Sequence, residues 1–265
     1  MTTELETGTI RVEPRGDIAL VRIDNAARFN ALTVEMWGEL RATVTRLVEG
    51  AAYRCLVFAG AGESFAAGAD ISEFERERSN RAQVTHYHEN HVRPTLDAIL
   101  SSPVPTVAMI RGVCMGGGLE IASMCDIRIA ADDARFGVPI NRMGFPMALG
   151  ETELLFKFFG RSIMAELLLE GRIYAAAEAL AKGIIQRVVP ADGLETEAMA
   201  TAARIAAASP FAQRRNKEQL LRLLRDWSPV TMDERMAHYD FADTRDYRAG
   251  YEAFLAKQRP NFTGT

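Results

Sequence analysis

Residues 112–120 read Gly-Val-Cys-Met-Gly-Gly-Gly-Leu-Glu and join three consecutive glycines to a carboxylate. They follow an apolar run at 105–110 and precede residues 121–125, which are predicted to form a short buried helix. Glycines lose much backbone entropy on folding, so three together indicate a sharp turn or a backbone that lies against a ligand. A helix that begins at the second or third glycine would point free N–H groups at that ligand. We therefore predict a backbone site for a developing negative charge, with Glu120 beside it.

The common glycine-rich motifs do not fit this stretch. A dinucleotide fingerprint starting at Gly116 would need glycine or alanine where Ile121 stands. A P-loop starting at Gly112 would need lysine, then serine or threonine, where Gly118 and Leu119 stand. No serine occupies the position of a nucleophile elbow. Taken alone, the stretch fits equally well a glycine turn that only lets a helix pack closely.

A second loop of small residues, Phe-Ala-Ala-Gly-Ala-Asp-Ile at 65–71, follows another apolar run at 55–59. With these two loops the chain resembles the enoyl-CoA hydratase/isomerase family, the crotonases, over nearly its whole length. Further matching stretches occur in the family's order, at residues 30–32, 124–126, 136–139, 171–173, 176–183, 253–257 and 261–262. This series of motifs indicates the family more strongly than the reaction, because function depends on the site and not on the fold.

The resemblance implies which residues carry the chemistry. In this family two backbone N–H groups hold the thioester oxygen as it becomes an enolate, and here the matching donors are Ala69 and Gly117. Preorganised donors aimed at developing charge stabilise a transition state strongly. Glu120 matches an acidic position that hydratases of the family use, so we expect an acid/base role. The alternative is a carboxylate that only complements the helix dipole.

The sequence departs from the family pattern at the second acidic position. That position follows residues 136–139 and is occupied by Ile140, which cannot move a proton or orient water. The pocket wall opposite Glu120 is therefore expected to be less polar than in a hydratase with two glutamates. Glu151 and Glu153 stand nearby in the sequence and could compensate from the next helix, but we expect both in its exposed first turn instead.

The substrate-binding residues are also inferred from the resemblance. Arg28 and Phe29, together with Ile71 and Ser72, are expected at the nucleotide end of a coenzyme A thioester. Further contacts are expected from Ala67, Asp70, Gly116, Ile140 and Lys257. Lys217, Phe254 and Lys257 are weaker candidates, which a neighbouring subunit could contribute. The coenzyme A is part of the substrate, and no other cofactor is expected.

Composition indicates a globular enzyme with a sizeable core. Of 265 residues, 48% are hydrophobic and 25% are charged, and the formal net charge of -4 argues against a binder of nucleic acid or anionic membrane. Cys55, Cys114 and Cys125 show no metal spacing and read as reduced core thiols of a cytoplasmic protein. Neither a signal peptide nor a membrane-spanning run is apparent.

Three histidines, His86, His88 and His91, invite interpretation as a metal site. Only His88 and His91 would share a helical face, and no aspartate or cysteine partner stands out. We therefore expect an exposed polar helix without a metal. Asp126 is expected to be structural and to connect a strand to a loop.

Apolar periodicity predicts strands and helices in alternation. Predicted strands span residues 10–12, 18–23, 55–59, 107–110, 126–130, 135–137 and 184–189. Predicted helices cover a stretch after the N-cap Thr33, residues 72–100 with an interruption at Pro94, 151–169 with a break near Gly160, 175–181, and a stretch to about residue 208. Asp192 and Glu195 are predicted to cap that last helix as a pair.

Everything beyond Pro210 is predicted to be helical, with breaks near Pro229 and Asp243. The pattern indicates an α/β fold with a C-terminal helical extension. The resemblance implies a crotonase-type spiral of ββα turns in residues 1–195 and a helical oligomerisation region in 196–265. It also implies a homotrimer or a dimer of trimers.

Three functions remain open at this stage. The first is hydration or dehydration of a 2,3-unsaturated acyl-CoA, in which Glu120 protonates the enolate carbon or activates water. The second is another enolate reaction on the same scaffold, either a double-bond shift or a decarboxylation. Decarboxylation needs no second acid, and an apolar wall at Ile140 would favour it. The third is a non-catalytic acyl-CoA-binding or RNA-binding protein, and the acidic composition argues against RNA.

Overall fold

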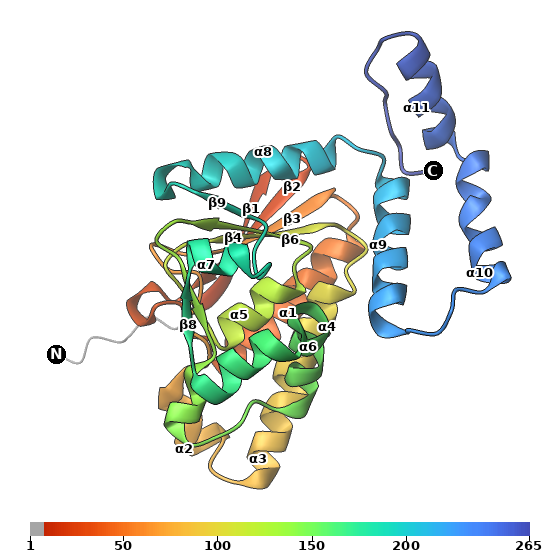
Figure 1. The fold of residues 1–265 in the computed structure, drawn as a ribbon. Coiled ribbons are helices and arrows are strands. Elements are labelled where there is room, and N and C mark those ends of the chain that lie inside the picture. The colour runs from red at the N-terminus through yellow and green to blue at the C-terminus, as the bar shows by residue number, and fades with distance from the viewer. Residues whose placement is uncertain (1–7) are drawn as a thin grey trace.

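The computed structural model describes residues 8–265 and confirms the mixed α/β fold (Figure 1). The larger sheet has six strands in the order β1 (Thr9–Arg15), β2 (Ile18–Asp24), β3 (Cys55–Gly60), β4 (Thr106–Ile110), β6 (Ile127–Ala131) and β9 (Arg187–Val189). β1 and β2 form an antiparallel hairpin, and all other neighbours pair in parallel. The central strands β3 and β4 are buried along almost their whole length, as expected for parallel strands covered on both faces.

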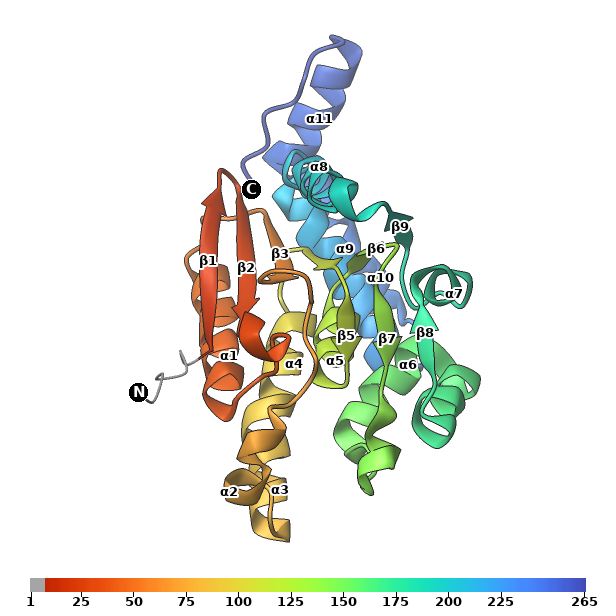
Figure 2. The ribbon, with the colours of Figure 1, turned by 90° about the vertical axis from the view of Figure 1, so that its left-hand side faces the viewer.

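A second, smaller sheet lies beside the first (Figure 2). It consists of β5 (Val113–Met115), β7 (Arg135–Gly137) and β8 (Ile173–Ala175). The chain passes from β4 to β5 at Gly112, which has a φ of 54°. A Cβ at Gly112 would lie 2.1 Å from the carbonyl oxygen of Glu63. Only glycine fits this passage, which brings the chain to the second sheet just before the three glycines.

Helices cover both faces of the larger sheet. In chain order they are α1 (Val34–Glu49), α2 (Phe74–Glu77), α3 (Arg81–His86), α4 (Arg93–Leu100), α5 (Gly117–Met124), α6 (Leu149–Ala165), α7 (Ala176–Ala181), α8 (Leu194–Ala206), α9 (Pro210–Arg225), α10 (Met232–Ala237) and α11 (Arg245–Leu255). α1, α4 and α5 pack in the main core, and α8 lies across the opposite face of the larger sheet (Figure 1). The predicted break in α6 is confirmed, since Gly160 has non-helical backbone angles.

Helix α1 forms as its sequence predicts. The Thr33 side chain accepts a hydrogen bond from the Met36 N–H at 3.1 Å and caps the first turn. The apolar stripe that includes Met36, Trp37 and Leu40 is buried. The helix therefore delivers Trp37 to the centre of the core, where its indole N–H donates to the Tyr87 hydroxyl at 2.9 Å.

Residues 81–100 form one continuous helical segment, which corrects the predicted interruption at Pro94. Between α3 and α4 lies a π-helical stretch, η3 (Tyr87–Val92). A proline lacks an N–H and its ring needs room near the carbonyl four residues earlier, and the wider π-helical turn provides that room. The helix therefore passes through Pro94, and the π-turn also changes which side chains share a face.

Two predictions just before the tail are wrong. The strand predicted at 184–189 is only Arg187–Val189, because Ile184 and Ile185 turn back and donate hydrogen bonds to the carbonyl of Ala179. Asp192 does not cap α8, because residues 191–193 form a 3₁₀ turn and Gly193 takes the N-cap position without a side-chain bond. The predicted domain boundary at 195/196 falls inside α8, which packs on the larger sheet.

The segment beyond α8 extends from the sheets (Figure 1). α9 packs against the core through Leu221 and Leu224, whereas α10 and α11 lie farther out. Much of its apolar surface is exposed, including Trp227 at 80%, Phe254 at 83% and Leu255 at 77%. None of the helices between residues 8 and 265 combines the length and hydrophobicity that crossing a bilayer requires.

Candidate active site

The loop of residues 65–70 is held between two neighbouring backbones. Ala67 N donates to Phe29 O at 3.0 Å on one side, and Ala66 O accepts from Met115 N at 2.9 Å on the other. Leu32 N donates to Gly68 O at 2.7 Å, and Asp70 N donates to Leu32 O at 2.9 Å. Ala69 lies between Gly68 and Asp70 and pairs with Leu32 in a parallel bridge, so its own N–H points away from Leu32. The Ala69 N–H is thus fixed and faces the opposite side.

Gly117 supplies a second free N–H at the same place. Gly116 turns the chain with a φ of 47°, and α5 begins at Gly117, the second of the three glycines, as predicted. A Cβ on Gly68 would lie 3.4 Å from Gly117 N, so the two backbones touch. Within residues 8–265 no carbonyl or side chain accepts a hydrogen bond from Ala69 N or Gly117 N. The geometry therefore places two unused donors side by side at the positive end of a helix.

A different structural constraint requires glycine at each of the three positions. Gly116 adopts a backbone conformation that disfavours side chains, and a Cβ on Gly117 would lie 2.8 Å from the Trp37 ring. A Cβ on Gly118 would lie 2.2 Å from the Ala66 carbonyl oxygen. Close packing therefore explains Gly117 and Gly118, while Gly116 supplies the turn before α5. The packing interpretation of the glycine stretch is thus confirmed, and its ligand-binding role stays a prediction.

A pocket opens in front of these donors. The predicted residues that line it are Ala67, Ala69, Ile71, Gly116, Gly117, Glu120 and Ile140. Its other apolar walls come from Trp37, Val92, Met115, Val138, Met143, Phe145, Pro146 and Met147. The polar side chains among its lining are Arg78, Tyr87, His88, Glu120 and Glu151. An apolar pocket with a few convergent polar groups is the usual form of a small-molecule site.

Glu120 is a buried carboxyl in the first turns of α5, with 8% of its surface exposed. Burial, and secondly the charge of Glu151, raise its pKa to about 8, while Arg78 opposes the shift. At neutral pH the group is therefore mostly protonated and can donate a proton. A carboxyl tuned in this way is typical of a general acid.

This raised pKa makes Glu120 a cost to stability at high pH. In the unfolded chain the carboxyl ionises near 4.5, but in the folded protein it stays neutral up to about 8. The stability of wild type relative to Glu120→Gln is thus greatest below pH 4.5 and falls as pH rises toward 8. Between about pH 5 and about pH 8, the free energy of unfolding of Glu120→Gln, measured in urea, is expected to rise by roughly 3 kcal/mol relative to that of wild type. A constant difference across that range would contradict the raised pKa.

The predicted exposure of Glu151 is wrong. Glu151 lies in the first turn of α6, but only 2% of its surface is exposed, and it lines the pocket. Its Oε1 lies 3.1 Å from His88 Nδ1. Glu153 matches the prediction, because it is exposed and pairs with Lys157 at 2.8 Å. The pocket therefore contains a second carboxylate in addition to Glu120, contributed by a different helix.

The histidines also differ from the prediction. The π-helical turn brings the His86 and His91 rings together, with Nε2 atoms 3.3 Å apart, and leaves His88 facing the pocket. Across residues 8–265 no three His, Cys, Asp or Glu side chains cluster as metal ligands. Neither His88 nor Glu151 was expected to be buried at the pocket, and their position there makes both functional candidates.

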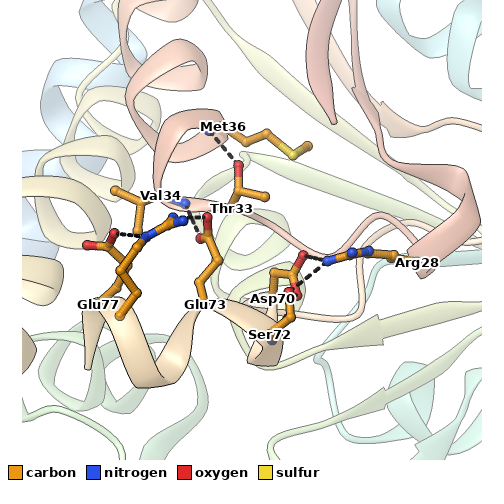
Figure 3. A network of polar contacts seen from close by, with 9 residues as sticks. Arg28, Thr33, Val34, Met36, Asp70, Ser72, Glu73 and Glu77 are labelled. Carbon is orange, nitrogen blue, oxygen red and sulfur yellow. Dashed lines mark hydrogen bonds and ion pairs between the residues drawn. The ribbon is translucent and has the colours of Figure 1, made fainter. Parts of the chain in front are cut away.

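A polar cluster of Arg28, Asp70 and Ser72 flanks Ile71, which lines the pocket (Figure 3). Arg28 Nη1 lies 2.5 Å from Asp70 Oδ2 and donates to Ser72 Oγ at 2.8 Å. Burial alone would raise the pKa of Asp70, but hydrogen bonds from Ser72 and Arg28 hold it below its ordinary value. Glu73 beside this cluster accepts from the Val34 N–H at 2.8 Å and anchors the start of α1 (Figure 3).

Two apolar side chains stand exposed next to the cluster. Phe29 is 63% exposed and Ile71 is 59% exposed. Phe29 also has a φ of 51°, which is uncommon for a residue with a large side chain. An exposed aromatic held in a costly backbone conformation suggests a surface kept for binding. The structure thus brings together Arg28, Phe29, Ile71 and Ser72.

The basic residues of the tail do not join the Arg28–Asp70–Ser72 cluster. Lys257 is exposed beyond the end of α11, and Phe254 is also exposed. Lys217 instead pairs with Asp126 at 2.8 Å, and Asp126 accepts from Thr106 N at 2.7 Å. Asp126 is therefore structural, as predicted. All three cysteines are buried, and burial raises the pKa of the Cys55 thiol to about 12.

Comparison with known proteins agrees with these features. The family model for enoyl-CoA hydratase/isomerase matches residues 13–265. A probable enoyl-CoA hydratase of Mycobacterium tuberculosis is 34% identical, over 96% of this chain and 98% of that protein. A short-chain-enoyl-CoA hydratase of Clostridium acetobutylicum is 30% identical, over 96% of this chain and 97% of the relative.

Solved structures resemble the whole chain. A Magnetospirillum magneticum protein described as an enoyl-CoA hydratase/carnithine racemase superposes with a TM-score of 0.93 at 41% identity, covering 97% of this chain and 96% of that one. A Bacillus anthracis enoyl-CoA hydratase superposes with a TM-score of 0.89 at 31% identity, covering 97% and 99%. The expected crotonase fold is confirmed.

The matching family model and these relatives identify the chain as an enzyme of the enoyl-CoA hydratase type. The chain belongs to the enoyl-CoA hydratase/isomerase family.

Proposed function

We propose that the protein adds water to 2,3-unsaturated acyl-CoA thioesters and catalyses the reverse dehydration. The observation that carries this proposal is the pair of unused N–H groups, Ala69 and Gly117, at the edge of a pocket that also contains Glu120. A thioester oxygen placed between these donors is stabilised as it gains negative charge. The protonated Glu120 then delivers a proton to the enolate carbon. The chain supplies all these groups, so the reaction needs no cofactor beyond the coenzyme A of the substrate.

The binding path we propose rests on the apolar lining of the pocket and on the exposed side chains beside it. The acyl chain enters the apolar interior bounded by Met115, Ile140 and Phe145. The nucleotide portion lies against Phe29 and Ile71 and beside the Arg28–Asp70–Ser72 cluster. Lys257 would add a positive charge to the nucleotide only from a neighbouring subunit.

Decarboxylation is the second candidate, and one observation favours it. Arg78 lines the pocket, and within the described part of the chain it makes no salt bridge with a carboxylate. Arg78 would bind a substrate carboxylate, and the apolar wall at Ile140 would accept the uncharged carbon dioxide that leaves. Loss of carbon dioxide leaves an enolate, which the same two N–H groups would stabilise.

A turnover screen separates these functions. The enzyme is mixed with crotonyl-CoA, a 3-enoyl-CoA and methylmalonyl-CoA, and the products are separated by chromatography. Hydration of crotonyl-CoA at the highest rate supports the proposal. Preferred turnover of methylmalonyl-CoA supports decarboxylation, and conversion of the 3-enoyl thioester alone supports an isomerase. Binding of all three without turnover would indicate a non-catalytic acyl-CoA-binding protein.

The assembly we propose is a homotrimer or a dimer of trimers in the cytoplasm. The exposed apolar surface of α9–α11 is too large to remain in water, and a second copy of the chain would cover it. Removal of residues 210–265 is expected to yield a destabilised monomer. Analytical ultracentrifugation of the intact and shortened chains measures this, and a stable intact monomer would contradict it.

A further inference from the structure

Glu151 is buried at the pocket, although a carboxylate at the start of a helix is usually exposed. It stands in the first turn of α6, where a negative charge needs only to face the helix N-terminus. Here it is turned inward and almost fully buried, and it lines the pocket that Glu120 lines. Burying a charge is costly unless hydrogen bonds compensate it, so its partners decide its role.

A chain of polar contacts holds the Glu151 carboxylate. Arg78 Nη2 lies 3.4 Å from His88 Nε2, and His88 Nδ1 lies 3.1 Å from Glu151 Oε1. Arginine can only donate, so His88 Nε2 acts as the acceptor and the ring proton resides on Nδ1. His88 Nδ1–H then donates to the carboxylate. This hydrogen bond fixes the orientation of the Glu151 carboxylate.

Arg78 is itself held in place by aromatic rings. Its guanidinium lies 4.2 Å from the centre of the Phe74 ring, 4.8 Å from Tyr87 and 4.9 Å from Phe145. Such contacts stabilise a partly buried cation and restrict its side chain. Arg78 thus does not touch Glu151 directly: it contacts His88, and His88 contacts the Glu151 carboxylate.

Glu120 stands in a contrasting environment. Within residues 8–265 no side chain donates a hydrogen bond to its carboxyl. The titratable and charged groups around it are Glu151, Arg78, Tyr87 and His88. Two carboxyl groups in one pocket, one that accepts a hydrogen bond from a histidine and one without a side-chain donor, have the unlike environments that separate a general base from a general acid.

We propose that Glu151 is the general base that activates the water, with His88 and Arg78 as its positioning residues, and that it replaces the carboxylate missing at Ile140. This inference rests on the proposed hydration. Glu151 removes a proton from water as the water oxygen bonds to C3, and the C2=C3 electrons move into the thioester enolate held by Ala69 and Gly117. Glu120 gives its proton to C2 as the enolate collapses. Exchange with solvent returns Glu151 to its ionised form and Glu120 to its protonated form.

Two assays distinguish this role from a structural one. The first measures hydration of crotonyl-CoA. The second follows by NMR the exchange of the C2 protons of butyryl-CoA in D₂O, a step that needs the enolate site and Glu120 but no attack at C3. Glu151→Gln is expected to lower hydration by about 100-fold or more while C2 exchange stays within about threefold of wild type. Glu120→Gln is expected to lose both activities.

Three further variants sharpen the test. Glu153→Gln, on the same helical turn but exposed, is the matched control and should change neither assay. His88→Gln should lower hydration less than Glu151→Gln, because the carboxylate remains but loses its fixed orientation. Ile140→Glu placed in the Glu151→Gln background should recover part of the hydration, since it returns a carboxylate to the pocket wall.

The possible failures are separable. Hydration by Glu151→Gln within about threefold of wild type would overturn the inference while the proposed function stands. Loss of both hydration and exchange in a folded Glu151→Gln protein would also overturn it, since it would show that Glu151 only supports the pocket. Absence of crotonyl-CoA hydration in wild type would instead refute the proposed function, and the inference with it.

Discussion

Glu120→Gln is expected to lower turnover by about two to four orders of magnitude while acyl-CoA affinity changes little. The amide keeps the shape of the carboxyl in its buried position, but it cannot transfer a proton. Because Glu120 accepts no hydrogen bond from another side chain of the described chain, the substitution removes no side-chain hydrogen bond within residues 8–265. Steady-state rates and a binding titration with a saturated acyl-CoA measure the two quantities.

The pattern of losses identifies the role. Unchanged turnover would exclude Glu120 as the acid and leave Glu151 as the proton donor. Weaker binding with unchanged turnover of bound substrate would show that Glu120 only positions the ligand.

Gly118→Ala is expected to destabilise the fold by at least about 3 kcal/mol. The added methyl group would lie 2.2 Å from the Ala66 carbonyl oxygen. That carbonyl cannot move away easily, because it accepts the Met115 N–H at 2.9 Å and helps to hold the 65–70 loop. The free energy of unfolding from denaturant titration measures the effect.

Gly38→Ala is the matched control. Gly38 lies on the exposed face of α1, and a Cβ there would meet nothing within 4 Å. Alanine is the better helix former, so this variant should be more stable by about 0.5–1 kcal/mol. If both glycine variants had similar stability, close approach at Gly118 would not be the reason for that glycine.

The start of α5 was predictable because its signals are local. The first turn of a helix has free N–H groups, whatever the helix packs against. The glycines within residues 112–120 therefore predicted where α5 begins and that Glu120 lies near its first turn. Thr33 and the apolar stripe after it likewise predicted α1, since capping and periodicity act within a few residues. These expectations needed no knowledge of the remaining chain.

The burial of Glu151 and the place of His88 at the pocket were not predicted, because they depend on distant parts of the chain. A carboxylate in the first turn of a helix is usually exposed, and only packing of α6 against the helical segment of residues 81–100 turns Glu151 inward. The π-turn at Tyr87–Val92 changes the spacing of the histidines, which a regular helical period cannot predict. The one available signal was that Glu151 stands near Ile140, where the second acid of the family pattern is missing.

The most direct test of the central claim is a crystal structure with an unreactive acyl-CoA bound. The account predicts the thioester oxygen within roughly 2.7–3.1 Å of both Ala69 N and Gly117 N, with C2 facing Glu120. It also predicts the acyl chain along Ile140 and the nucleotide at Phe29. A thioester oxygen that contacts neither amide, with the acyl chain outside this pocket, would contradict it.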